Sequence, residues 1–174
     1  MKVGDNKTTS KGRFFLNTYL VPRLANILQD GEQVLFIGTD TSWDYKPFFW
    51  NPAKQCPYYT IDKAEQYKPD MVGNIEDCPQ VNDNAFSLVI MIGVWEFLDH
   101  PPIALEEIKR ILSPNGYLLI AFPGRGYYND NRGVFPTDTY DILETIAGLR
   151  ILEQYNIYEG KEEPNSICVL AQKK

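Results

Sequence analysis

The segment from residue 86 to residue 123 constrains the fold of this chain more than any other part of the sequence. Two apolar runs, Phe86–Val94 and Tyr117–Phe122, flank a stretch whose apolar side chains recur at helical spacing. Continuous apolar runs of this kind are typical of strands that are covered on both faces. Pro101–Pro102 can open the helix, and Ser113–Gly116 ends it. A strand, a helix and a second strand in this order predict a parallel crossover, the building block of a doubly wound α/β sheet.

Further apolar runs predict the other strands of the same sheet. They lie at 34–38, 58–62, 70–73, 150–158 and 166–172. Residues 63–69 leave room for a turn but not for a full crossover helix, so we expect a reduced helix between the second and third strands. Before the first strand, apolar spacing over residues 14–28 predicts one or two helices, divided at Pro22. Because ligands bind beyond the carboxyl ends of parallel strands, the loops that follow these strands form the candidate site.

The length and composition of the chain fit a single packed domain. Its 174 residues are 44% hydrophobic and 13% aromatic, which is ample for a core. The polar residues 1–12 predict a flexible N-terminal tail, and residues 13–174 one domain. No apolar run reaches the roughly 18 to 20 residues that span a bilayer, and the N-terminus lacks the apolar core of a signal peptide. Three cysteines without metal-type spacing indicate reduced thiols in a cytoplasmic protein.

Charge and motifs argue against several classes of function. The formal net charge of −6 disfavours nucleic acid as a partner, because phosphate binding usually requires a basic surface. A single histidine and scattered cysteines offer no metal-ligand spacing, so no metal is expected. The sequence contains neither a Gly-x-Ser-x-Gly elbow nor a Walker-type phosphate loop. The oligomeric state cannot be deduced from these features.

Two stretches of the sequence resemble a known family. The text VGNIEDCPQVNDNAFSLVI (72–90) and the text VWEFLDHPPIALEEIKRILSPNGYLLIAFP (94–123) are similar to the signature of class I S-adenosylmethionine-dependent methyltransferases, especially their small type-11-like members. The resemblance extends over about residues 34–123, roughly half of the chain. It implies a Rossmann-like, doubly wound, mostly parallel seven-stranded sheet. It also implies S-adenosylmethionine as cofactor and direct in-line methyl transfer to a small-molecule or glycan-linked acceptor.

The resemblance also implies which residues bind the cofactor. They follow the carboxyl ends of the first four strands: Gly38, Thr39, Asp40, Asp62, Asn74, Ile75, Gly93 and Val94. Asp62 matches the acid that accepts hydrogen bonds from the ribose hydroxyls. Asn74 and Ile75 match the pair around the adenine, where a backbone carbonyl accepts from the exocyclic amine and a backbone N–H donates to the ring. Asn74 is equally explained as a turn former.

The loop after the first strand departs most from the family pattern. The text VLFIGTDTS keeps Gly38, but it has Phe36 where an acid is common, and Asp40 and Ser42 where glycines are usual. Asp40 either binds the ammonium group of the cofactor or crowds the pocket. An alternative hypothesis is therefore a catalytically degenerate methyltransferase-like domain that acts as a binding or scaffolding protein. A nicotinamide oxidoreductase on the same fold class is a weaker alternative, because its glycine fingerprint is absent.

The acceptor is expected to meet the loops after the fourth and fifth strands. The candidate substrate-binding residues are Trp95, Arg125, Tyr127, Tyr128 and Arg132. Trp95 is equally explained as a core aromatic, and the other four as a solvated loop. Glu96 matches an acid of the family, whereas Phe97 replaces the histidine that commonly follows. Asp99 and His100 are the candidates for acid–base catalysis, although a histidine near a helix start is often incidental.

Overall fold

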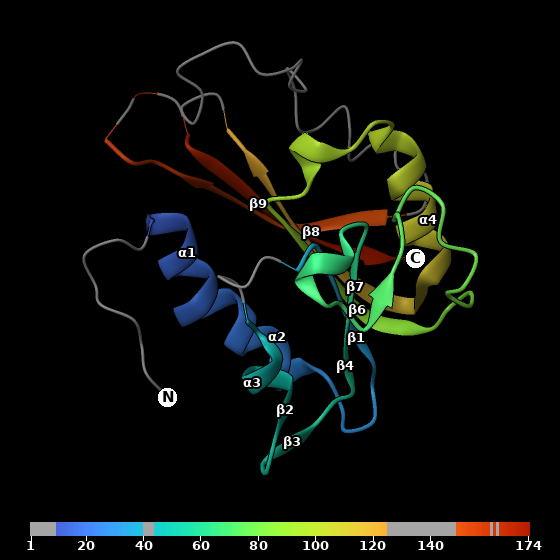
Figure 1. Cartoon of the computed structure of the whole chain (residues 1–174). Helices are drawn as coiled ribbons and strands as arrows, with labels where there is room; N and C mark the ends of the chain where they lie inside the picture. Colours follow the sequence, from blue (N-terminus) through green and yellow to red (C-terminus); the bar gives the residue numbers. More distant parts are fainter. Residues whose placement is uncertain (1–9, 40–43, 125–148, 161, 163) are drawn as a thin grey trace.

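In the part of the chain that the structure describes, seven strands form one sheet at the centre of the molecule (Figure 1): β1 (Val34–Ile37), β4 (Tyr58–Asp62), β5 (Met71–Val72), β6 (Phe86–Ile92), β7 (Leu112–Pro123), β8 (Leu149–Ile157) and β9 (Ser166–Lys173). This computed structural model describes residues 10–39, 44–124, 149–160, 162 and 164–174. The strand order is β5–β4–β1–β6–β7–β9–β8. The first five strands of this order are parallel, and β9 runs antiparallel to both β7 and β8. The expected seven-stranded, mostly parallel sheet is confirmed.

Short helices connect and cover the strands. They are α1 (Lys11–Phe15), the π-helical turn η1 (Leu16–Leu20), α2 (Val21–Ile27), α3 (Lys46–Phe49), the 3-10 turns η2 (Glu65–Tyr67) and η3 (Trp95–Phe97), and α4 (Pro101–Ile111). A small hairpin of β2 (Trp50–Asn51) and β3 (Lys54–Gln55) extends from the loop before β4. Between β4 and β5 the chain forms only the single turn η2, as the short spacing predicted.

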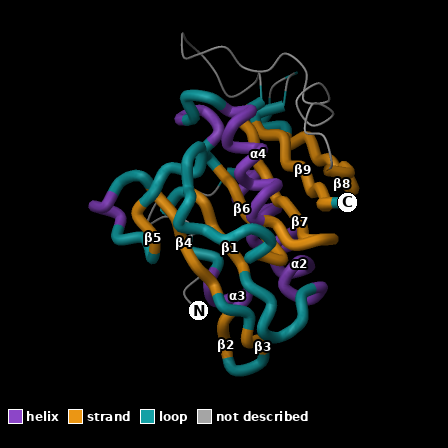
Figure 2. Tube along the Cα trace, turned by 90° about the vertical axis from the view of Figure 1, so that its right-hand side faces the viewer, coloured by secondary structure: helices purple, strands orange, loops and turns teal. Residues whose placement is uncertain are grey.

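Both faces of the sheet are buried, which explains the continuous apolar runs in the sequence. Because side chains alternate along a strand, Leu35 and Ile37 of β1 belong to one core cluster, whereas Val34 and Phe36 belong to the other. Helix α4 covers the first face (Figure 2), and the N-terminal helices α1 and α2 cover the second (Figure 1). The sheet is therefore the middle of three layers.

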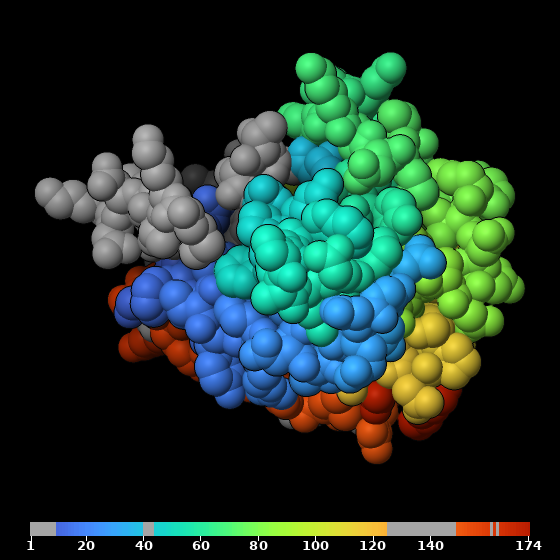
Figure 3. Space-filling view, turned by 90° about the horizontal axis from the view of Figure 1, so that it is seen from below, coloured from blue at the N-terminus to red at the C-terminus, as the bar shows by residue number. Residues whose placement is uncertain are grey.

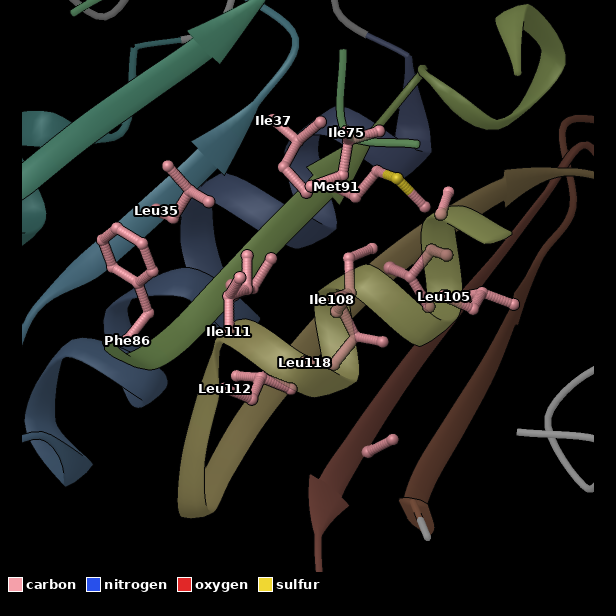
Figure 4. Packing of buried hydrophobic residues seen from close by; sticks show 14 of the residues in the cluster. Leu35, Ile37, Ile75, Phe86, Met91, Leu105, Ile108, Ile111, Leu112 and Leu118 are labelled. Atoms are coloured by element: carbon pink, nitrogen blue, oxygen red, sulfur yellow. The ribbon is translucent and has the colours of Figure 1, made fainter. Parts of the chain in front are cut away.

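Helix α4 packs against the sheet through the stripe that the sequence predicts. Leu105, Ile108 and Ile111 point toward Met91 of β6 and Leu118 of β7 (Figure 4). The helix begins with two prolines, which have no N–H to donate and therefore fit its first turn. Strand, helix and strand form the expected parallel crossover.

The N-terminal helices are divided near the proline, as expected. The chain changes from the π-helical turn η1 to α2 at Val21, directly before Pro22. These helices lie beside the segment that contains the hairpin (Figure 3), where Lys54 Nζ donates to the carbonyl oxygen of Leu28. The first helix begins at Lys11, and Ser10 Oγ accepts from the N–H of Arg13 at 3.2 Å. Residues 11 and 12, which the sequence analysis placed in the tail, therefore belong to this helix.

Two details of the strands differ from the sequence prediction. Strand β6 ends at Ile92, so residues 93 and 94 belong to the following loop. Strand β7 begins at Leu112 rather than at residue 117, because Leu112 pairs with Phe86 before the chain bulges. Asn115 has a φ of +62°, a left-handed conformation that asparagine tolerates well. The turn at residues 113–116 is therefore built into the strand as an irregularity and does not precede it.

Candidate functional site

A cavity of about 350 Å³ opens at the carboxyl ends of the parallel strands. This volume is in the range of small-molecule sites. Six of the eight predicted cofactor-binding residues line it: Gly38, Asp62, Asn74, Ile75, Gly93 and Val94. They come from the end of β4 and from the loops after β1, β5 and β6. The structure thus brings together residues that lie up to 56 positions apart (94 − 38) in the sequence.

Asp62, the last residue of β4, is held in place by backbone groups. Its Oδ2 accepts from the N–H of Thr39 at 2.7 Å and from Thr39 Oγ1 at 3.3 Å, and its Oδ1 accepts from the N–H of Ala64 at 2.8 Å. A carboxylate has about four acceptor positions, so capacity remains for further donors. The carboxylate is oriented in advance toward the cavity that it lines. Thr39 is not part of the cavity wall, and it contributes to the site by orienting the Asp62 carboxylate.

Two glycines shape the wall of the cavity for different reasons. Gly38 has a φ of +85°, and a Cβ added there would lie 2.3 Å from Cγ2 of Val94. Gly93 has a φ of +66°, and a Cβ there would meet no described atom within 4 Å. Glycine is thus required at position 38 because of the left-handed backbone conformation and because Val94 leaves no room for a Cβ. At Gly93 the backbone faces open space, so a ligand can approach it closely.

Asn74 and Ile75 form a turn that borders the cavity. Asn74 Oδ1 accepts from the N–H of Glu76 at 3.1 Å, and its carbonyl oxygen accepts from the N–H of Asp77 at 2.9 Å. The side chain of Asn74 therefore has the turn-forming role that the sequence left open. Its carbonyl oxygen keeps a second acceptor position. Ile75 is buried and adds an apolar surface beside it.

The cavity also includes residues that the sequence did not propose as site residues. They are Ile37, Ile61, Lys63, Ala64, Tyr67, Gly73, Ile92, Phe97 and Leu98. Two of them, Tyr67 and Phe97, are aromatic residues that are 45% and 61% exposed, respectively. Lys63 Nζ donates to the carbonyl oxygen of Phe97 at 3.3 Å, which links the loops after β4 and β6. For Tyr67 the signal in the sequence was its position after a predicted strand, and for Phe97 it was also its place at the position of the family's histidine.

Trp95 lies in the core and not in the cavity wall. It is 6% exposed, and its ring stacks edge-on against Phe122 with 4.7 Å between the centroids. The structure therefore favours the core explanation over the predicted substrate contact. An indole packed in this way cannot reach an acceptor without leaving the core.

Asp99 and His100 also lie outside the cavity wall, at the start of α4. The side chain of His100 is 70% exposed, and its Nδ1 lies 3.8 Å from Oε1 of Glu76. The backbone N–H groups of both residues donate to the Glu76 carboxylate. In the described contacts the Glu76 carboxylate thus caps the backbone of both residues, and the prediction that they catalyse receives no support from their position. The remaining predicted residues, Asp40, Arg125, Tyr127, Tyr128 and Arg132, lie outside the described residues.

The cysteines provide no reactive thiol. Cys56, Cys78 and Cys168 are all free and buried. Burial raises the pKa of Cys78 and of Cys168 to about 12, and burial also raises the pKa of Cys56. A thiol with a raised pKa is a poor nucleophile. Within the described ranges, no group of three or more His, Cys, Asp or Glu side chains is placed to hold a metal. None of the described helices has the length and apolar character needed to cross a membrane.

Comparisons with known proteins agree with this geometry. Residues 56–120 match the family model described as a methyltransferase domain. No curated protein sequence matches the chain significantly. The matched segment contains β4 to β7 for most of their length, and with them the loops that carry Asp62, Asn74, Ile75, Gly93 and Val94.

Solved structures share the fold over nearly the whole chain. A SAM-dependent methyltransferase from Aquifex aeolicus has a TM-score of 0.68 at 19% identity, with 92% of this chain and 93% of that chain covered. A TehB-like SAM-dependent methyltransferase from Corynebacterium glutamicum has a TM-score of 0.63 at 20% identity, with 94% of each chain covered. The N-methyltransferase NodS from Bradyrhizobium japonicum has a TM-score of 0.68 at 12% identity, with coverage of 88% and 92%.

The structural similarity to these proteins establishes the fold, and the match to the family model adds the sequence signature over residues 56–120. The predicted resemblance is thereby confirmed. Residues 56–120 thus match a methyltransferase domain, a family whose cofactor is S-adenosylmethionine, and the chain as a whole has the fold of SAM-dependent methyltransferases.

Proposed function

We propose that this protein transfers a methyl group from S-adenosylmethionine to a small-molecule or glycan-linked acceptor by direct in-line displacement. One observation carries the proposal. Six residues that the resemblance assigns to the cofactor, from the end of β4 and the loops after β1, β5 and β6, line one cavity. The charge of −6 supports an acceptor other than nucleic acid.

The described cavity fits the adenosine part of the cofactor. Asp62 would accept hydrogen bonds from the ribose hydroxyls, because its carboxylate is already oriented by Thr39 and Ala64. The carbonyl oxygen of Asn74 and the apolar side chain of Ile75 would border the adenine. Gly93 leaves open space in the wall, which suits a ligand that contacts the backbone.

The chemistry requires orientation more than it requires a protein nucleophile. Bound S-adenosylmethionine supplies an electrophilic methyl group on a sulfonium. Holding the acceptor in line with that group can lower the barrier by about 7 to 11 kcal/mol at the upper end. Among the described residues that line the cavity there is no histidine or cysteine. We therefore assign this chain the tasks of binding, orientation and exclusion of water.

The methionine part of the cofactor is assigned to the loop after β1. We propose that Asp40 binds the ammonium group there, in place of the missing acid and glycines. 5′-Methylthioadenosine tests this assignment, because it lacks the amino-acid part of S-adenosylhomocysteine. Asp40→Ala should weaken binding of S-adenosylhomocysteine and leave binding of methylthioadenosine unchanged. Equal affinities of wild type and variant for both ligands would exclude the assignment.

The acceptor is assigned to the loop after β7. We propose that Arg125, Tyr127, Tyr128 and Arg132 contact it, as side chains suited to anionic or sugar-like groups. One structural relative, NodS, is described as an N-methyltransferase, so amines belong in the acceptor panel. The free thiols support a cytoplasmic location as a further proposal.

A turnover assay over a panel of acceptors tests the proposed function, because it detects the product that all acceptors share. Formation of S-adenosylhomocysteine should rise above background with at least one class of small amines, phenols or sugar derivatives. RNA should give no turnover. Binding of S-adenosylmethionine without turnover over a broad acceptor panel would instead support the degenerate, scaffolding alternative.

A further inference from the structure

A buried carboxylate beside the cavity has no role in the function described so far. Glu76 follows Asn74 and Ile75 in the loop after β5, and its side chain is only 7% exposed. Burial of a charged carboxylate is costly unless it is hydrogen-bonded. The hydrogen-bond donors to the Glu76 carboxylate therefore indicate its structural role.

The carboxylate of Glu76 bonds to the start of α4. Its Oε2 accepts from the N–H of Asp99 at 3.3 Å, and its Oε1 accepts from the N–H of His100. The next two residues are prolines, which have no N–H to donate. Asp99 and His100 thus carry donors immediately before the helix, where a negative charge is also favoured by the helix dipole.

These contacts join two walls of the cavity. The loop that contains Glu76 contributes Asn74 and Ile75 to the cavity, and the loop that leads to Asp99 and His100 contributes residues 93, 94, 97 and 98. A change at Glu76 would therefore allow the two walls to separate.

The far side of the same loop is held independently. Arg110 of α4 donates to the carbonyl oxygen of Val81 at 2.7 Å and to that of Cys78 at 3.1 Å. It also pairs with Glu107 at 2.8 Å and with Asp83 at 2.6 Å. Loss of Glu76 would thus release the cavity side of the loop while Arg110 retains the other side.

We propose that Glu76 is a positioning residue that holds the adenosine-binding loop against the loop after β6 and so sets the affinity for the cofactor. This inference rests on the proposed function, because it takes adenosine to be the ligand of this cavity. Glu76 does not contact the ligand in this account. It acts through the backbone of Asp99 and His100.

Calorimetric titration of the full chain with S-adenosylhomocysteine and with adenosine tests the proposal. Glu76→Ala should weaken binding of both ligands by the same factor, about ten-fold or more, because charge-assisted hydrogen bonds between the walls are lost. Glu76→Gln keeps one acceptor oxygen and should recover part of the affinity. The matched control is Glu106→Ala on α4, where the side chain is 61% exposed and pairs with Lys109 at 3.4 Å. Its affinities should equal those of wild type.

The titrations are made well below the thermal midpoint of each variant, so that a loss of stability alone leaves affinity unchanged. Wild-type affinity in folded Glu76→Ala would overturn the proposal. If that variant does not fold, wild-type affinity in Glu76→Gln would do the same. Absence of binding by the wild-type chain would contradict the proposed function itself, and this inference with it.

Discussion

The Oδ2 atom of Asp62 accepts a hydrogen bond from the backbone N–H of Thr39 at 2.7 Å. This contact joins the end of β4 to the loop after β1, next to the point where the N–H of Gly38 donates to the carbonyl oxygen of Ile61 at 2.9 Å. Two neighbouring strands are thereby fixed at the edge where the cavity opens. The same carboxylate that we assign to the ribose also holds Thr39, the residue that follows the glycine in the cavity wall.

Gly38→Ala should lower both stability and cofactor affinity. Alanine at a φ of +85° costs about 1 to 2 kcal/mol by conformation alone, and the new Cβ would also displace Val94. Gly31→Ala is the matched control, because Gly31 has a φ of +86° but open space around its Cβ position. Urea denaturation should show a larger loss of stability for Gly38→Ala than for Gly31→Ala. Equal losses, with unchanged binding of S-adenosylhomocysteine, would show that Val94 yields freely.

Trp95→Ala should mainly lower stability, whereas Phe97→Ala should mainly weaken cofactor binding. Trp95 is 6% exposed in the core, so its removal should cost about 3 to 5 kcal/mol of unfolding free energy. Phe97 is 61% exposed and lines the cavity, so its removal should change stability by about 0.5 kcal/mol or less and weaken cofactor binding. Denaturation and calorimetry on both variants measure the two effects. A stable Trp95→Ala chain with lost turnover would restore the predicted substrate contact.

Stability should fall with acid through an ion pair that joins α2 to β8. Arg23 donates to the Glu153 carboxylate, with one contact at 2.8 Å, and Tyr155 donates to it as well. The hydrogen bond from Arg23, followed by that from Tyr155, holds the pKa of Glu153 below its ordinary value. Because the folded-state pKa is the lower one, the pair stabilises the fold fully above the unfolded pKa of about 4.3. This contribution is lost as the pH falls through the folded-state pKa.

Arg23→Ala should therefore destabilise the chain by about 1 kcal/mol at pH 7 and lose less stability than wild type between pH 5 and acid unfolding. Denaturation midpoints across this range measure both effects. The control is Lys109→Ala, which removes an exposed pair with Glu106 and should leave the acid profile unchanged. If the stability of wild type and of Arg23→Ala fell in parallel with acid, the ion pair between Arg23 and Glu153 would not be a source of the acid sensitivity.

Much of the fold followed from periodicity, because strands covered on both faces produce apolar runs that are hard to mistake. The hairpin β2–β3 and α3 were not predicted, since the aromatic stretch from Tyr45 to Trp50 has no clear period. The start of β7 was predicted five residues late (117 − 112), because Ser113–Gly116 has the composition of a free turn. Here strand pairing continued through the turn and overrode local preference.

The site residues that lie at the ends of strands could be predicted from the sequence. Asp62 and Gly93 lie at the ends of strands, so the fold alone brings them to one edge of the sheet. Tyr67 and Phe97 were missed because exposed aromatic residues at a rim depend on how two loops approach each other. Trp95 could not be assigned from sequence, since a core indole and a substrate-binding indole have the same neighbours in the chain.

Calorimetric titration of wild type and Asp62→Ala with S-adenosylhomocysteine tests the central claim most directly. Wild type should bind within the roughly 1 μM to 1 mM range of ordinary enzyme constants. Asp62→Ala should bind about 10- to 100-fold more weakly, because the hydrogen bonds to the ribose and the anchor of Thr39 are both lost. Asp77→Ala, which removes an exposed carboxylate outside the cavity wall, should match wild type. No heat from wild type at millimolar ligand, or equal affinity in Asp62→Ala, would contradict this account of the cavity.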